Sequence, residues 1–257
     1  MRVSRVAVLT NKGDDVDRNM NLWRKVFTTD PSAVKPISGK AYKGNSPKPF
    51  WLIEQATRVF GPVGIGWGIT VKSERFERVT ETDVLHVAIV SVWYVWEGVR
   101  SETFDQMGGT KAAYMSKNGM VVDEDAGKKS ITDGMVKCLS MIGFAGDIFS
   151  GRWDDSKYVA QAGREFAWRA EVEQFAEDHT LPTERAEIVV LAADRAIELH
   201  EKGDDMGAYE QYESLANNEE KLACWSRLRP HSAVRSAIKA VGKNQRPADA
   251  GEPHAAS

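Results

Sequence analysis

The sequence is poor in cysteine and has no long apolar run. Its 2 cysteines, Cys138 and Cys224, lie far apart and form no Cys-x-x-Cys pair. So few cysteines exclude a disulfide framework and suit a reducing compartment. No apolar stretch approaches the about 20 residues that a bilayer-spanning helix needs, and the N-terminus has no signal-peptide core. We therefore expect a cytoplasmic protein without a membrane partner.

The sequence also lacks the motifs of nucleotide and zinc chemistry. The glycine-rich run 61–68 is followed by no Gly-Lys-Ser/Thr, and it leads from a predicted helix into a predicted strand, the reverse of a phosphate-binding loop. None of the 5 histidines has the spacing to a cysteine or an acid that a zinc site requires. No Ser-His-Asp or Cys-His arrangement is present to argue from. The pattern indicates no cofactor.

Three aspartates leave one enzymatic alternative open. Asp147, Asp154 and Asp155 lie close in sequence, and paired carboxylates can hold Mg²⁺ beside a phosphate, as in a nuclease. The competing interpretation is a solvated turn at GRWDDSK, residues 151–157, in which the aspartates cap the backbone or pair with Arg152 and Lys157. We favour the turn and keep a Mg²⁺-dependent nuclease as the alternative.

Charge is divided unevenly along the chain. Residues 1–160 hold 22 Lys and Arg against 19 Asp and Glu, whereas residues 161–257 hold 12 against 18. A mildly basic body with an acidic C-terminal part is compatible with nucleic-acid binding by the body. Residues 31–49 form a predicted loop rich in proline, and this loop contains lysines but no acid. Its lysines are Lys35, Lys40, Lys43 and Lys48.

The hydrophobic pattern predicts an α+β fold built on an antiparallel meander. A short helix is expected at 22–27 and a longer one from Pro49 to Gly61. Strand patterns follow at 65–72, 85–96 and 100–105. Both faces of 85–96 are largely apolar, so we expect this strand to lie in the middle of the sheet or to be covered on both sides. Residues 106–122 contain Gly108-Gly109 and Asn118-Gly119 and predict a loop or a partly helical insert.

A clear helix is predicted after the acidic residues 123–125. Its apolar stripe contains Ile131, Met135, Cys138, Leu139 and Ile142, and Gly143 is expected to end it. From residue 161 onward the pattern is helical. Predicted helices begin at a Thr183 cap, at Asn218 and at Ser232, and residues 243–257 predict disorder.

Basic residues line one flank of this predicted helix. Lys129, Asp133 and Lys137 are spaced i, i+4, i+8, and Lys128 lies in the same first turns. The ordinary interpretation is a solvated helix face. The lysine loop and nearby aromatics, including Tyr42 and Trp67, favour phosphate contacts instead. Cations interleaved with rings suit single-stranded DNA, whose phosphates bind cations and whose bases stack on aromatics.

Three blocks of the sequence resemble phage single-strand DNA annealing proteins of the Sak and Erf types, which are similar to the eukaryotic Rad-type annealing protein. The blocks are TDPSAVKPI at 29–37, FWLIEQATRVFGPVGIGW at 50–67 and GKKSITDGMVKCLSMIGFAGDIFSGRWDDSKYV at 127–159. The third block is the most specific, through Thr132-Asp133-Gly134 followed by Leu139 and Gly143.

The resemblance implies a β-β-β-α annealing core, a three-stranded meander packed on helices, at 28–160. An N-terminal arm at 1–27 would precede it, and a helical C-terminal module at 161–242 and a disordered tail at 243–257 would follow. It further implies a homo-oligomer, as a ring or a helical filament. The function would be ATP-independent binding and annealing of complementary strands in phage homologous recombination, in the host bacterial cytoplasm. Such a protein is not an enzyme and needs no cofactor.

The resemblance also implies site residues and partners. Lys128 and Lys137 match positions of DNA-contacting basic residues in the eukaryotic relative, Lys129 is adjacent, and Trp51 occupies a region where that relative has an arginine. Similar proteins often use a C-terminal module to contact an exonuclease or the host single-strand binding protein, and Trp225 lies on such a helix. A passive single-strand binder is a further alternative. The candidate DNA-binding residues are Lys128, Lys137, Lys129, Lys43, Lys48, Lys40, Lys72, Arg75, Arg152, Lys157, Tyr42 and Trp67.

Overall fold

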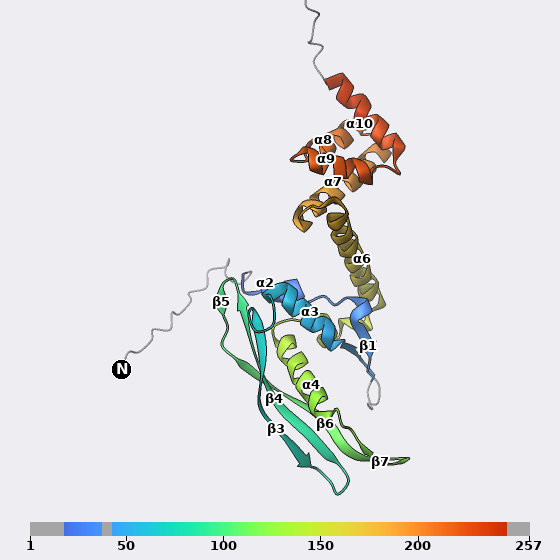
Figure 1. Cartoon of the computed structure of the whole chain (residues 1–257). Coiled ribbons are helices and arrows are strands. Elements are labelled where there is room, and N and C mark those ends of the chain that lie inside the picture. The colour runs from blue at the N-terminus through green and yellow to red at the C-terminus, as the bar shows by residue number, and fades with distance from the viewer. Residues whose placement is uncertain (1–17, 38–42, 246–257) are drawn as a thin grey trace, which may run out of the picture. The chain divides into compact units, whose positions relative to one another are not determined.

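The structure, a computed structural model, describes residues 18–37 and 43–245. The chain divides into two compact units, residues 1–163 and 164–257, and the border falls inside helix α6 (Ser156–His179). Unit 1 combines a sheet with helices and unit 2 is helical (Figure 1). The predicted α+β class is confirmed.

The sheet of unit 1 is antiparallel throughout, in the order β3-β4-β6-β7. Strand β4 lies between β3 and β6, which confirms the prediction of a central strand at 85–96. A short β5 pairs with the end of β4. The strands are β3 (Trp67–Arg78), β4 (Val84–Trp96), β5 (Val99–Arg100), β6 (Phe104–Ser116) and β7 (Gly119–Val122).

The predicted third strand is present but begins at Phe104 instead of Arg100, and the predicted loop or partly helical insert at 106–122 was wrong. Strand β6 runs through most of that region and turns at Gly119 into β7, so the meander has four strands instead of three. Gly108, which suggested a loop, lies where helix α4 (Ala126–Met141) crosses the strand. A Cβ at Gly108 would stand 1.8 Å from the carbonyl oxygen of Ser130. The glycine therefore permits close helix–sheet contact.

Helix α4 is seated on β4 and β6 through small residues. A Cβ at Gly134 would stand 2.7 Å from Cγ2 of Val90, and Ser130 Oγ donates to the carbonyl of His86 at 2.9 Å. Met135 and Leu139 are buried in the core beneath the helix. The helix ends before Gly143, whose φ of 104° confirms the predicted end.

The N-terminal part of unit 1 packs on this core. The predicted helix at Pro49–Gly61 is confirmed as α3, whereas the predicted loop at 31–49 holds a small hairpin of β1 and β2. Leu22 and Val26 are buried with Leu52, so the described part of the predicted 1–27 arm belongs to unit 1. These elements are α2 (Asn21–Val26), η1 (Pro31–Ala33), β1 (Val34–Pro36), β2 (Asn45–Pro47), α3 (Pro49–Phe60), α5 (Gly146–Phe149) and η2 (Arg152–Asp154).

Unit 2 is a helical bundle around an apolar core that includes Val189, Val190 and Leu228. Thr183 is the first residue of α7 and not its cap, because Pro182 occupies the cap position. Asn217 caps α9 by accepting from the Glu220 amide at 2.9 Å. The helices after α6 are α7 (Thr183–Glu201), α8 (Asp205–Glu213), α9 (Asn218–Arg227) and α10 (Ser232–Gln245).

A buried acid joins two helices of unit 2. Glu220 is 2% exposed and accepts two hydrogen bonds of 2.7 Å from the Arg185 guanidinium, which links α9 to α7. It also accepts from the Ala216 amide at 3.0 Å. The hydrogen bonds from Arg185 hold the pKa of Glu220 below its ordinary value. The carboxylate is therefore stabilised in its charged form.

None of the helices in residues 18–37 and 43–245 has the length and apolar character to cross a bilayer.

Candidate nucleic-acid interface

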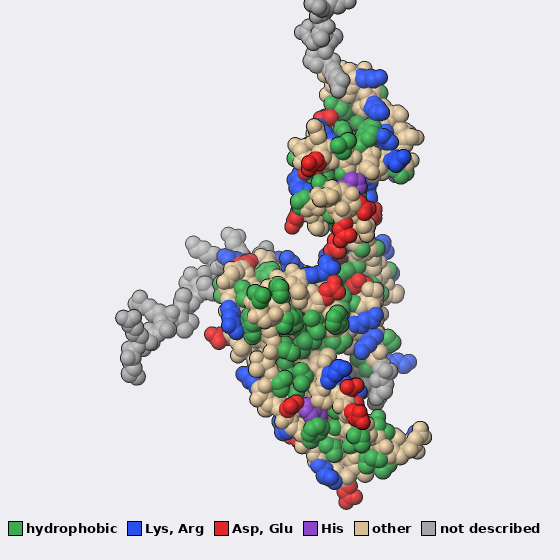
Figure 2. Space-filling view, viewed as in Figure 1, with side chains coloured by type: hydrophobic (Ala, Val, Ile, Leu, Met, Phe, Trp, Pro, Cys, Tyr) green, Lys and Arg blue, Asp and Glu red, His purple; other side chains and the backbone are tan. Residues whose placement is uncertain are grey.

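A groove of about 340 Å³ lies between the β1–β2 hairpin, the start of α3 and the first half of α4. We call it the α4 groove. On the face in Figure 2, hydrophobic side chains gather in the middle of unit 1, with basic and acidic side chains intermixed around them. The lining contains three lysines and two aspartates, namely Lys35, Lys128, Lys129, Asp125 and Asp133, together with Ser46, Pro49, Thr132 and Val136.

Lys128 is the most loosely held of the groove's paired cations. Its side chain is 80% exposed, and its ammonium lies 3.9 Å from Asp125 Oδ1. Exposed pairs of this kind are worth about 0–1 kcal/mol, because water screens the charges and ordering long side chains costs entropy. The ammonium of Lys128 can therefore exchange Asp125 for another anion at little cost.

Lys129 and Lys137 are held more tightly along one flank of α4. Lys129 donates to both carboxylate oxygens of Asp123, at 2.7 and 2.8 Å, and this hydrogen bonding raises the pKa of the lysine. Lys137 donates to Asp133 at 2.8 Å and to the carbonyl of Met107 at 3.0 Å. The predicted shared flank is thus present, with both lysines paired at the surface.

The lysines of segment 31–49 differ in their surroundings. Lys35 lines the groove and Lys43 is exposed. Lys48 donates to the carbonyl of Ser32 at 2.8 Å, which ties the end of the hairpin to η1. Lys40 and Tyr42 lie outside the described residues.

Lys72 and Arg75 lie on the opposite face of the sheet from α4. Lys72 donates to Asp105 at 2.7 Å, whereas the next side chain along β6, Gln106, reaches Met141 of α4. Successive strand residues point to opposite faces, so Asp105 and Lys72 face away from the helix. Arg75 alternates with Phe76, whose ring meets His86 of the α4 face edge-on. Arg75 itself pairs with Glu77 at 2.5 Å. These two predicted site residues are not brought to the groove.

Arg152 and Lys157 also belong to another part of unit 1. The Arg152 guanidinium lies over the rings of Phe27 and Tyr158, 5.0 and 5.8 Å from their centroids. Lys157 is exposed at the start of α6. Neither residue is among those that line the α4 groove.

The prediction that Trp67 stacks on DNA bases was wrong. Its side chain is 1% exposed and its indole nitrogen donates to Thr57 at 3.4 Å, so the ring belongs to the core. Phe50 was not among the predicted site residues. Its side chain is 80% exposed, and it directly follows the groove residue Pro49. Its position outside the buried stripe of Leu52, Ala56 and Phe60 on α3 could have identified it.

The three aspartates of the nuclease alternative separate into two environments. Asp147 is fully buried and accepts from the amide and hydroxyl of Thr29, at 2.8 and 2.6 Å, and from Tyr158 at 3.0 Å. Asp154 and Asp155 are exposed, and Asp155 accepts from the Lys157 amide at 2.8 Å. The turn interpretation therefore suits Asp154 and Asp155, whereas Asp147 lies outside that turn and is buried.

Asp147 has a structural role that its burial explains. It ties the segment after α2 to α5 and to the first turns of α6. Burial, followed by the negative charge of Asp147, raises the pKa of Tyr158 to about 12. Within the described ranges, no group of three or more His, Cys, Asp or Glu is placed to hold a metal ion.

Comparison with known proteins identifies no family for this chain. The sequence matches no protein-family model and none of the curated proteins with which it was compared.

Proposed function

We propose that this protein binds single-stranded DNA along the α4 groove and anneals complementary strands without ATP or metal. The observation that supports the proposal is the position of Lys35, Lys128 and Lys129 around one groove. Lys137 follows two turns further along α4. Four cations in such an arrangement suit a chain of phosphates.

The chemistry of the groove favours a backbone contact over base recognition. Ammonium groups bind phosphates as point charges and carry no sequence information. A strand held by its phosphates keeps its bases free to pair with a second strand. The ion pairs of Lys129 and Lys137 are exposed, so phosphates can replace the carboxylates at a small cost in free energy.

The resemblance to phage annealing proteins extends the proposal to assembly, location and partners. The protein works as a homo-oligomer, a ring or a helical filament, which presents successive α4 grooves to one strand. It acts in phage recombination in the host bacterial cytoplasm, without cofactor and not as an enzyme. An exonuclease or the host single-strand binding protein contacts the C-terminal module.

An annealing assay tests this function directly. Two complementary oligonucleotides, one with a fluorophore and one with a quencher, are mixed with and without the full chain in EDTA and without ATP. We expect the protein to accelerate quenching, and the acceleration to fall steeply with salt because phosphate contacts release counterions.

The same assay separates the two alternatives. A passive single-strand binder would slow the quenching, since coated strands cannot meet. A nuclease would shorten an end-labelled oligonucleotide when Mg²⁺ replaces EDTA, and an annealing protein would leave its length unchanged. Slower quenching, or shortened DNA in Mg²⁺, would contradict the proposal.

A further inference from the structure

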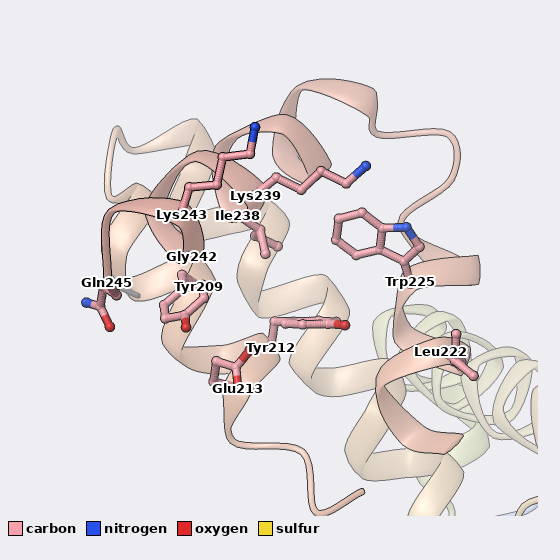
Figure 3. Close-up of a pocket in the computed structure, with 10 residues that line it drawn as sticks. All are labelled: Tyr209, Tyr212, Glu213, Leu222, Trp225, Ile238, Lys239, Gly242, Lys243 and Gln245. Atoms are coloured by element: carbon pink, nitrogen blue, oxygen red, sulfur yellow. The ribbon is translucent and has the colours of Figure 1, made fainter. Parts of the chain in front are cut away.

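Unit 2 contains a second groove with a different lining. It has a volume of about 720 Å³ and lies between α8, α9 and α10. We call it the α10 groove. Figure 3 shows Tyr209, Tyr212, Trp225 and Ile238 around it, with the ammonium groups of Lys239 and Lys243 beside them. The groove therefore combines an aromatic surface with a basic rim.

A row of basic residues runs along α10. Arg235, Lys239 and Lys243 are spaced i, i+4, i+8, and residues 231–245 contain no acid. The surrounding unit is acidic, because residues 164–245 hold 11 Lys and Arg against 16 Asp and Glu. The row is thus a local positive stripe on a negative body, and it faces the groove through Lys239 and Lys243.

Trp225 is fixed between this row and α8. The Arg235 guanidinium and the Lys239 ammonium lie 4.5 and 5.2 Å from its ring centroid, and the Tyr212 ring meets it edge-on at 5.5 Å. Gly242 lets α10 approach α8, since a Cβ there would stand 3.1 Å from Cε2 of Tyr209. These contacts fix Trp225 and Tyr212 in place along the groove.

We propose that the α10 groove binds an acidic peptide segment of another protein. An aromatic or aliphatic side chain of the peptide would lie among Tyr209, Tyr212 and Trp225, and its carboxylates would meet Lys239 and Lys243. A groove of this size that joins apolar walls to a few charged groups is typical of a ligand site. Charge complementarity between the α10 row and an acidic partner sets the orientation.

A peptide fits this groove better than a nucleic acid does. A DNA strand carries a charge on each nucleotide, whereas the described cations that line the groove are two, Lys239 and Lys243, and Glu213 of the lining already pairs with Lys221. Leu222, which is 70% exposed, adds an aliphatic surface that gains from contact with an apolar side chain.

Selection from a display library of random dodecapeptides on the full chain tests the proposal. We expect enriched peptides in which Asp or Glu flank Phe, Trp or Leu. The enriched sequences are then synthesised with a fluorophore, and their affinity is measured by anisotropy. Failure to enrich any peptide, or enrichment of basic peptides, would overturn the proposal.

Two double variants, each lacking two positive charges, test whether the peptide binds in the α10 groove. Lys239→Gln with Lys243→Gln should weaken binding at least tenfold. Arg195→Gln with Lys202→Gln removes the same charge from α7 and its C-cap, outside the groove, and should change affinity less than twofold. Circular dichroism checks that both variants are folded. Equal affinities of the two double variants would overturn the site.

One competitor and one truncation test other occupants of the α10 groove. A twelve-nucleotide thymidine strand should not displace the peptide from the full chain, and displacement would identify the groove as a nucleic-acid site. Removal of residues 246–257 should leave the peptide affinity unchanged. Tighter binding after that removal would identify the chain's own tail as the occupant and would overturn the proposal.

Discussion

The two grooves of this protein are both lined by lysines but differ in what lies between the lysines. The α4 groove of unit 1 contains three lysines with two aspartates and no aromatic side chain among its lining residues. The α10 groove of unit 2 contains three aromatic side chains and two lysines. Lysine count alone therefore does not define the partner.

The difference indicates which polymer each groove can hold. A surface of alternating cations and exchangeable carboxylates suits a uniformly charged backbone, because each phosphate can replace one carboxylate. A surface of fixed rings with cations at one rim suits a chain that carries both apolar and acidic side chains. The predictions below change either the packing that supports one groove or a residue in or beside it. The changes at Gly108, at Phe50 and at the lysines of α4 are each compared with a matched control variant.

The largest effect on stability is expected where α4 packs on β6. Gly108→Ala would place a Cβ 1.8 Å from Ser130 O and 2.5 Å from Gly134 N, both backbone atoms, so the helix must move. We expect a loss of about 3 kcal/mol in the free energy of unfolding, as for overpacked cores. Urea denaturation followed by circular dichroism measures it.

The neighbouring glycine supplies the control for this variant. A Cβ at Gly109 meets only His86 O, at 3.8 Å, so Gly109→Ala should change stability by less than about 0.5 kcal/mol. Equal losses in the two variants would mean that α4 does not depend on close contact with β6.

Helix α9, which forms one wall of the α10 groove, is expected to depend on Glu220 for its attachment to α7. Glu220→Gln leaves the Arg185 guanidinium without its charged partner, and we expect a loss of about 2 kcal/mol, because hydrogen bonds to charged groups are worth about 1.5–3 kcal/mol. Urea denaturation at pH 7 measures this loss of unfolding free energy.

The loss caused by Glu220→Gln should also depend on pH. The pKa of Glu220 is lowered in the folded state, so its stabilising effect is fully present above the ordinary glutamate value and disappears as the pH falls through the lowered value. The difference between wild type and Glu220→Gln should therefore shrink in acid. A difference that is constant from pH 7 to pH 3 would contradict this role.

A smaller effect is expected at Phe50, which would add an aromatic contact beside the α4 groove. Phe50→Ala should weaken single-stranded DNA binding about fivefold, since a base stacked on a ring is worth about 1–3 kcal/mol. Phe149→Ala removes another exposed ring, on α5, and should change binding less than twofold. Fluorescence anisotropy with a thymidine oligonucleotide compares them, and similar affinities of the two variants would remove Phe50 from the site.

The sequence predicted the elements whose patterns are local. Helix α3 begins at a proline and ends before a glycine, and β4 is apolar on both faces, so both were predicted closely. Strand β6 was missed because its glycines have a tertiary reason: Gly108 is required by Ser130, far away in the sequence. No local rule distinguishes such a glycine from one in a loop.

The candidate site was predicted less completely for a related reason. Residue type identified the lysines of α4, but the direction of each side chain depends on strand register. Lys72 and Arg75 therefore lie on the face of the sheet opposite α4, and Trp67 lies in the core. The α10 groove was not predicted, because it forms only where three helices meet.

The central claim is tested most directly by comparing the two faces of the sheet in the annealing assay. Lys128→Ala with Lys137→Ala should slow annealing at least tenfold. The same variant should reduce the slope of log binding constant against log salt concentration by about 1.4, because each phosphate contact to a single strand contributes about 0.7 to that slope. Lys72→Ala with Arg75→Ala removes the same charge from the opposite face and should slow annealing less than twofold. If the two double variants anneal at the same rate, the α4 groove is not where this protein holds DNA.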